Sequence, residues 1–472
     1  MIPNVLLLVL DAARRDALEP YGAAPGSTPA IAQLASRGKA LPSVYATGCW
    51  TVPSHASFFT GLMPRAAGLS RVPSPSASKP VLASHSERLL PEVLRRAGYS
   101  TGGVSANLWI SPESGFDLGF EAFEPVDSGR HAQFGDPSRR ARLRWLAEAA
   151  AGRADDGADA ISAALTRRIA ASGGRPFFAF ANVIECHSPY LPPRPYGDVS
   201  TLDRVRAAEE AQRYWNLNAI WRAGVGGLEV PSETLDRMRR LYRGAIRFLD
   251  DWVGRLLERL DTEGALDDTL VLLISDHGEN FGEGGLLAHA LSLDNRLIHV
   301  PFVAAGPGAE RLTITSLADL PRAIAESTGV DDHPWRDGPP PGVGVAQFDP
   351  PIEDPDDPRV VETVERWGLG LDARRRFTEP LTAAVAGDLK LVRRGEREEL
   401  FDLADDPLEL SPRSPDSIDA SRADQVAALR RALEHPAMTS VRPESSSAAA
   451  AGPPSQEELS DIEERMKLLG YM

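Results

Sequence analysis

The stretch from residue 4 to residue 11, Asn-Val-Leu-Leu-Leu-Val-Leu-Asp, decides the fold. Its unbroken Val and Leu run has the length of a strand, and the lack of polar positions predicts a central strand covered on both faces. The run has no basic segment before it and no small-residue cleavage site after it, so we interpret it as a strand and not as a signal peptide. The strand delivers Asp11 at its carboxyl end, where open α/β sheets bind ligands.

Two more apolar runs end in the same way. Residues 176–184 lead into Glu185, Cys186 and His187, and residues 269–274 lead into Asp276 and His277. A further strand is expected at residues 100–105, and helices at residues 28–35, 89–97 and 233–260. This alternation predicts an α/β fold, a doubly wound and mostly parallel sheet with helices on both faces.

The composition divides the chain into unequal parts. Residues 1–330 carry the alternating pattern and form the large α/β domain, with a candidate insertion at residues 127–175. Residues 331–358 are rich in Pro, Gly and Asp and are expected to be a linker. A small α+β subdomain is expected at residues 359–410, with antiparallel strands at 381–385 and 389–393. Residues 411–455 are expected to be loosely ordered, and residues 456–472 to form a C-terminal helix.

The charge excludes several partners. The 472 residues contain 51 Lys+Arg and 67 Asp+Glu, so the net charge is −16. Nucleic acids and anionic membranes are themselves negative, so neither is expected to bind. No apolar run approaches the roughly eighteen residues of a membrane span, and the only cysteines, Cys49 and Cys186, are too few for a disulfide framework. We therefore expect a cytoplasmic protein that acts on small molecules.

Asp11, Asp276 and His277 form the first candidate site. Carboxylate oxygens and one imidazole at strand ends suit a divalent metal ion that activates a nucleophile or neutralises an anionic substrate. The glycine-rich residues 278–285 would let backbone approach such a ligand closely. The alternative is structural: Asp11 caps a turn, and Asp276 begins a polar loop.

Residues 50–61, Trp-Thr-Val-Pro-Ser-His-Ala-Ser-Phe-Phe-Thr-Gly, form the second candidate site. Pro53 in a first helical turn predicts a helix whose N-terminus, with its free N–H groups, lies beside Thr51. The Thr51 hydroxyl could attack a tetrahedral phosphorus or sulfur if a metal ion lowered its pKa. The alternative is that Thr51 is an N-cap residue.

Taken together, these segments resemble the sulfatase-like branch of the alkaline phosphatase superfamily. The similarity runs in the family's order over nearly the whole chain. The segments are residues 4–11 with Arg14, Asp16, Tyr21 and Gly22; residues 51–54 and 60–61; residues 187–190; residues 275–279; His289 ahead of residues 300–301; and residues 401–403, 406–409 and 468–471.

The resemblance implies roles for single residues. Asp11, Asp276 and His277 would bind one divalent metal ion, with Thr51 at the nucleophile position contacting it; Ca, Mn, Zn and Mg are not distinguished. A second metal ion would need a further aspartate and two histidines; His187 and His289 are the spare histidines, and Glu185 and Asp294, the candidate carboxylates, do not fit the family spacing. His187 and His289 would face the substrate as contacts to its anionic oxygens or as proton donor to the leaving group.

Three further residues are assigned to the substrate side of the site. Arg14 and Asn107 are expected to contact the anion of the substrate. His55 stands one helical turn from Thr51, where it would act as a base toward Thr51, contact the transferred group, or pack under the helix.

The departures from the family pattern are informative. Sulfatases carry cysteine or serine at the position of Thr51, for oxidation to formylglycine, and arginine at the position of His55. Residues 105–108 replace a Lys-Trp-His segment, and Leu291 replaces another lysine. Because three cations that would hold a sulfate dianion are missing, a threonine nucleophile acting on a phosphate or phosphonate ester, preferably a diester, is favoured.

Three alternatives remain open at the level of sequence. They are a sulfuric ester hydrolase that works without formylglycine, a transferase that passes a phospho group from Thr51 to an alcohol, and a non-catalytic binding protein.

Overall fold

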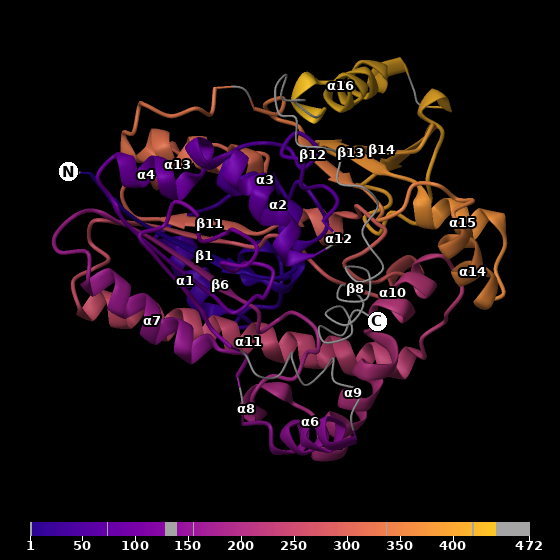
Figure 1. Cartoon of the computed structure of the whole chain (residues 1–472), viewed down its shortest axis with the longest axis horizontal. Coiled ribbons are helices and arrows are strands. Elements are labelled where there is room, and N and C mark those ends of the chain that lie inside the picture. The colour runs from indigo at the N-terminus through magenta and orange to yellow at the C-terminus, as the bar shows by residue number, and fades with distance from the viewer. Residues whose placement is uncertain are drawn as a thin grey trace.

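The computed structural model describes residues 2–72, 74–127, 139–153, 155–336, 338–417 and 420–439 (Figure 1). Its main sheet has seven strands in the order β2-β11-β7-β1-β6-β4-β5. Strands β7, β1, β6, β4 and β5 are parallel, and β11 and β2 complete one edge in antiparallel pairing. Their bounds are β1 Asn4–Leu10, β2 Gly38–Ala40, β4 Ser100–Ser105, β5 Ala122–Pro125, β6 Phe177–Val183, β7 Thr269–Ile274 and β11 Phe302–Ala305.

Strand β1 is central, as predicted. Leu7 pairs with Phe180 of β6 on one side and with Leu272 of β7 on the other. Leu6 and Leu8 belong to the core on one face of the sheet, and Val5 and Leu7 to the core on the opposite face. Because successive strand side chains alternate between faces, an unbroken apolar run needs cover on both.

Helices supply that cover on both faces, which confirms the α/β fold. In Figure 1, α7 and α11 lie below the sheet, and α2, α4 and α13 lie above it. The predicted helices at 28–35, 89–97 and 233–260 are α1, α4 and α11. The bounds are α1 Pro29–Ser36, α2 Thr51–Thr60, α3 Pro75–Ser84, α4 Leu90–Arg96, α7 Ala158–Ala170, α11 Ser232–Thr262, α12 Asn295–Ile298 and α13 Leu320–Thr328.

Only part of the candidate insertion at residues 127–175 lies outside the α/β layers. Helix α7 packs on β6 and β4 and places Ile161, Leu165 and Ile169 in the main core, so it belongs to the α/β layers. The abundant Arg, Ala and Asp residues hid this apolar spacing in the sequence. Helix α6, Arg139–Ala151, packs instead against α9, Thr201–Tyr214, and together with α8, Arg194–Gly197, lies below α11 in Figure 1. Helix α10, Leu217–Gly224, follows α9.

The C-terminal subdomain is larger than expected. Its antiparallel sheet has the order β12-β13-β14-β15, with β12 Gly344–Phe348, β13 Leu381–Ala386, β14 Leu389–Arg394 and β15 Arg397–Asp402. Strand β12 is fully buried within the stretch predicted as a linker, where surrounding Pro and Gly residues masked a short apolar run. Helices α14 Pro358–Arg366 and α15 Leu371–Thr378 complete the expected part.

Residues 411–455 also contain structure. Helix α16, Ala423–Leu433, packs Val426 and Leu429 onto the C-terminal sheet, so the expectation of loose order fails for this part. The predicted helix at 456–472 lies outside the described residues. Among the described residues, no helix is long and apolar enough to cross a membrane.

Replacement of Leu8 tests the role of β1 as the structural centre. Leu8→Ala should lower the free energy of unfolding by about 2–5 kcal/mol, because a fully buried leucine leaves a cavity between close-packed layers. Leu202 of α9, which is 58% exposed, provides the control. Leu202→Ala should change the free energy of unfolding by at most about 0.5 kcal/mol. Urea unfolding followed by tryptophan fluorescence measures both; equal effects would contradict the assignment.

Candidate active site

Three ligand-type side chains meet where β1 and β7 end side by side. Asp11 follows β1, and Asp276 and His277 follow β7. One ligand atom from each of the three lies within 4.8 Å of the other two, and all three side chains are fully buried. The structure therefore brings together the predicted metal ligands from opposite ends of the large domain.

The two carboxylates each keep one oxygen without a hydrogen-bond partner. These buried atoms are Asp11 Oδ1 and Asp276 Oδ2. Burial and the negative charge of Asp276 raise the pKa of Asp11 above its usual range. Two buried carboxylates so close together are stabilised by a shared cation. The donor set, two carboxylates and an imidazole, therefore fits a divalent metal ion.

The remaining oxygen atoms are held by the backbone and by amides. Asp276 Oδ1 accepts hydrogen bonds from the backbone N–H of Ala12 at 3.2 Å and of His277 at 3.0 Å. Asp11 Oδ2 accepts from Asn107 Nδ2 at 2.7 Å and from Asn182 Nδ2 at 3.4 Å. Asn107 thus orients Asp11, a candidate metal ligand. The sequence had instead led us to expect that Asn107 contacts the substrate.

His277 presents its Nε2 atom to the site. Its Nδ1 lies 2.9 Å from the carbonyl oxygen of Gly278, which is the geometry of an Nδ1–H donor. Nε2 then carries the lone pair, and it lies 3.3 Å from Thr51 Oγ1 and 3.6 Å from Asp11 Oδ1. A backbone carbonyl thus fixes the tautomer that a metal ligand needs.

Thr51 is the first residue of α2, and Trp50 occupies the N-cap position. The alternative of Thr51 as an N-cap is therefore wrong. Thr51 is 4% exposed and directs its hydroxyl at His277 Nε2. One turn along α2, the Ser54 hydroxyl donates to the carbonyl of Asp276 at 2.7 Å, which joins the helix to the β7 loop.

His55 packs under the helix, and both of its ring nitrogens are occupied. Nδ1 donates to the Thr51 carbonyl at 3.0 Å and lies 3.4 Å from Asp276 Oδ2. Nε2 accepts from Asn182 Nδ2 at 2.9 Å. These contacts favour a role in holding α2 against the metal ligands and do not favour a base directed at the Thr51 hydroxyl.

His289 lies beside His277, and His187 lies beside His289. The ring centroid of His289 is 4.3 Å from that of His277 and 5.0 Å from that of His187. Asp11 and Glu279 raise the pKa of His187, although burial acts to lower it. The rings of His187, His289 and His277 therefore lie next to one another, and His277 is the one beside Thr51.

Glu279 was not singled out from the sequence. It is fully buried, and His289 Nδ1 lies 3.0 Å from Glu279 Oε1. Burial acts to raise the pKa of Glu279, but His289 and its hydrogen bond hold that pKa below its usual range. Its place directly after the Asp276-His277-Gly278 segment was the available signal. Asn182 was missed because an asparagine inside an apolar strand carries no motif.

Arg14 is not placed as an anion contact. Its Nε and Nη2 donate to the Asp16 carboxylate at 2.9 and 2.6 Å, and its Nη1 donates to Glu283 Oε1 at 2.8 Å. The guanidinium side chain is 12% exposed and pairs with these two carboxylates. It instead ties the loop after β1 to the loop after β7.

The candidates for a second metal ion have other roles. The Glu185 carboxylate accepts the backbone N–H of Asp156 and of Ala158 at the start of α7. Asp294 pairs with Arg296 at 2.9 Å. The structure therefore describes one three-residue cluster able to hold a metal ion among the described residues.

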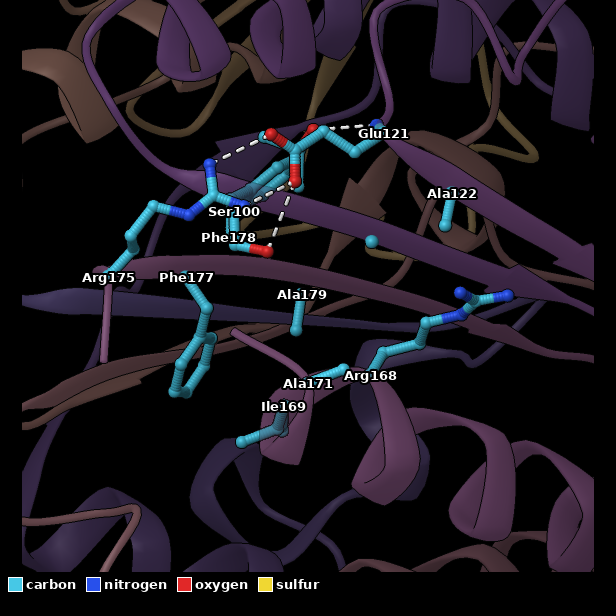
Figure 2. Close-up of a pocket in the computed structure, with 12 residues that line it drawn as sticks. Ser100, Glu121, Ala122, Arg168, Ile169, Ala171, Arg175, Phe177, Phe178 and Ala179 are labelled. Atoms are coloured by element: carbon cyan, nitrogen blue, oxygen red, sulfur yellow. Dashed lines mark hydrogen bonds and ion pairs between the residues drawn. The ribbon is translucent and has the colours of Figure 1, made fainter. Parts of the chain in front are cut away.

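A separate small cavity lies at the opposite ends of the strands. Figure 2 shows its lining by Ser100, Glu121, Arg168 and Arg175, near the starts of β4 and β6. Its volume is about 130 Å³, and Arg175 forms two hydrogen bonds to the Glu121 carboxylate at 2.9 and 2.8 Å. Because these charges pair with each other at the amino ends of the strands, the cavity is not part of the candidate active site.

Comparison with known proteins agrees with this geometry. The model of the sulfatase family matches residues 3–330. The choline-sulfatase of Rhizobium meliloti (strain 1021) is 27% identical over 453 residues, which cover 88% of this chain and 83% of that protein.

Solved structures share the fold. The phosphonate monoester hydrolase of Agrobacterium radiobacter has a TM-score of 0.61 at 20% identity, covering 92% of this chain and 95% of that one. The phosphonate monoester hydrolase of Silicibacter pomeroyi has a TM-score of 0.60 at 20% identity, covering 92% and 94%. The chain therefore belongs to the sulfatase family of hydrolases, and it shares its fold with the two phosphonate monoester hydrolases.

Proposed function

We propose that this protein is a metal-dependent hydrolase of phosphate or phosphonate esters, with a preference for diesters, and that Thr51 is its nucleophile. The observation that carries this proposal is the position of Thr51 Oγ1, 3.3 Å from His277 Nε2, an atom that itself lies 3.6 Å from Asp11 Oδ1 and 3.4 Å from Asp276 Oδ2. Asp11, Asp276 and His277 would hold the metal ion. The ion would supply positive charge that lowers the pKa of the threonine hydroxyl and neutralises the ester oxygens.

Thr51 reacts as the alkoxide, after its proton is lost to solvent. Its Oγ1 attacks phosphorus in line with the leaving alcohol, so that a Thr51 O–P bond forms as the ester O–P bond breaks. Water then attacks the phosphothreonine, breaks the Thr51 O–P bond and releases the product. The buried start of α2 keeps the hydroxyl in one place for both steps.

His289 is suited to protonate the leaving alcohol. Glu279 accepts its Nδ1–H, which orients the ring. In the second step the same ring takes the proton from the attacking water. His187, whose ring centroid is 5.0 Å from that of His289, would contact an ester oxygen.

The charge of the site supports a diester. Asp11, Asp276 and Glu279 are three buried carboxylates, and one divalent ion together with the histidine bound to Glu279 would only balance their charge. Leu291 and residues 105–108 stand where the family carries cations. A diester brings one negative charge to this site and a phosphate monoester brings two, so the diester is repelled less.

Sulfuric ester hydrolysis is the second candidate, because the choline-sulfatase relative covers most of the chain. Matched aryl phosphodiester, aryl phosphate and aryl sulfate substrates separate the candidates. We expect the diester to have the highest kcat/KM, and a preference for the sulfate would overturn our proposal. Added alcohol would raise the yield of alkyl phosphoester if transfer from Thr51 competes with hydrolysis.

Removal of the nucleophile gives the first test. Thr51→Ala should lower kcat on the diester by about 10³-fold or more, because no alkoxide can form. Thr51→Ser keeps a hydroxyl at the same position and should stay within about tenfold to a hundredfold of wild type. Initial-rate kinetics on purified proteins measure both, and equal loss in the two variants would contradict nucleophilic attack.

Metal content gives the second test. Wild type should contain about one divalent ion per chain, and dialysis against a chelator should abolish turnover until a divalent salt is restored. Asp276→Asn should bind the ion at least about tenfold more weakly, because a charged ligand is lost. Asp251→Asn, an exposed position on α11, is the control. Full activity of metal-free protein would refute the proposal.

Leaving-group dependence tests the Glu279–His289 pair. Glu279→Gln should lower kcat by about 10²-fold or more for diesters with alkyl leaving groups, which need a proton, and far less for 4-nitrophenyl esters. Glu283→Gln, whose carboxylate pairs with Arg14, is the control and should show no such dependence. A uniform loss over all leaving groups would argue against proton donation by His289.

A further inference from the structure

A buried ion pair links the C-terminal subdomain to the active site. Lys390 of β14 is fully buried, and its Nζ lies 2.5 Å from Glu409 Oε2. The same ammonium donates to the carbonyl of Leu293 at 2.6 Å and to Asn295 Oδ1 at 3.2 Å. Each of its three hydrogens therefore has an acceptor, two of them on the segment that follows His289.

Glu409 holds that segment from its other oxygen. Glu409 Oε1 accepts the backbone N–H of Asn295, the first residue of α12, at 2.6 Å. The backbone of Glu409 has φ of 56°, in the left-handed region that is unfavourable for a residue with a side chain. Such a conformation persists where surrounding contacts determine it, as the ion pair and the α12 contact do here.

We define residues 289–298 as the active-site loop, which begins at His289 and ends with α12. Its α12 end lies directly on the metal-ligand turn. Gly278 N donates to the carbonyl of Leu297 at 2.8 Å, and a Cβ at Gly278 would lie 1.8 Å from the carbonyl oxygen of Arg296. The turn that carries His277 and the loop that begins at His289 therefore cannot shift independently of α12.

The middle of the loop packs against helix α10. Leu291 is buried, and a Cβ at Gly224 of α10 would lie 2.9 Å from Leu291 Cδ1. Leu291 also has a left-handed φ of 58°. The loop is thus held between α10 and the C-terminal sheet, with the ion pair as its polar attachment.

Stability alone does not account for a buried ion pair. Removing two charges from water costs about as much as their attraction returns, and well-packed apolar replacements are often neutral or stabilising. We propose that Lys390 and Glu409 are positioning residues that fix the active-site loop so that His289 and His277 keep their reactive arrangement. The effect on turnover rests on the proposed function, whereas the effect on the loop does not.

The double variant Lys390→Met/Glu409→Leu separates positioning from stability. Because both charges are removed together, its thermal midpoint should remain within about 5 °C of wild type. Its kcat should fall by about tenfold or more while KM changes by less than about threefold, since the hydrolytic groups remain but lose their alignment. The assay uses whichever aryl ester wild type cleaves.

The control is Arg397→Met, which removes the exposed ion pair between Arg397 of β15 and Glu379. It should leave kcat unchanged.

Amide hydrogen exchange, measured on the same proteins, needs no substrate. Exchange should be faster in residues 289–298 of the double variant only. Unchanged exchange in the loop, an unchanged kcat, or a fall in activity that matches loss of folded protein would overturn the positioning role. Wild type that cleaves no ester would refute the proposed function, and loop exchange would still decide the role of the ion pair.

Discussion

The site depends on two buried carboxylates, Asp11 and Asp276, that lie close together at the ends of adjacent strands. Asp11 and Asp276 are fully buried, and Asp11 Oδ1 and Asp276 Oδ2 lack hydrogen-bond partners. An arrangement of this kind is costly without a cation, because burial and like charge both oppose ionisation. The surrounding polar groups hold the other carboxylate oxygens and so direct these two inward.

The sheet makes that arrangement possible. Neighbouring parallel strands end at the same edge, so residues 11 and 276 meet although most of the large domain separates them in sequence. Helix α2 brings Thr51 to the same edge, and Ser54 and His55 join the helix to the carbonyl and the carboxylate of Asp276. Reactive groups thus come from separate elements that share one rigid core.

The C-terminal subdomain also contacts the loop that carries His289. Its β14 and the segment after β15 provide a buried ion pair that holds the start of α12, and α12 lies against Gly278. Attachment of the active-site loop, residues 289–298, to the C-terminal subdomain gives that loop a defined position without adding to the central core. The subdomain therefore helps to fix the position of α12 next to the turn that carries His277.

The sequence alone determined the α/β fold, the central place of β1 and the cluster of Asp11, Asp276 and His277, because apolar periodicity and strand-end motifs are local signals. It misjudged β12, α7 and α16, whose short apolar patterns are diluted by Pro, Gly or charged neighbours. The sequence also left three roles open for His55, and it assigned Arg14 and Asn107 to contacts with the anion of the substrate. Only the tertiary structure chose among them, and only it revealed Glu279 behind His289 and Lys390 beside Glu409, because the partners of a buried polar group are set by packing between segments distant in the chain.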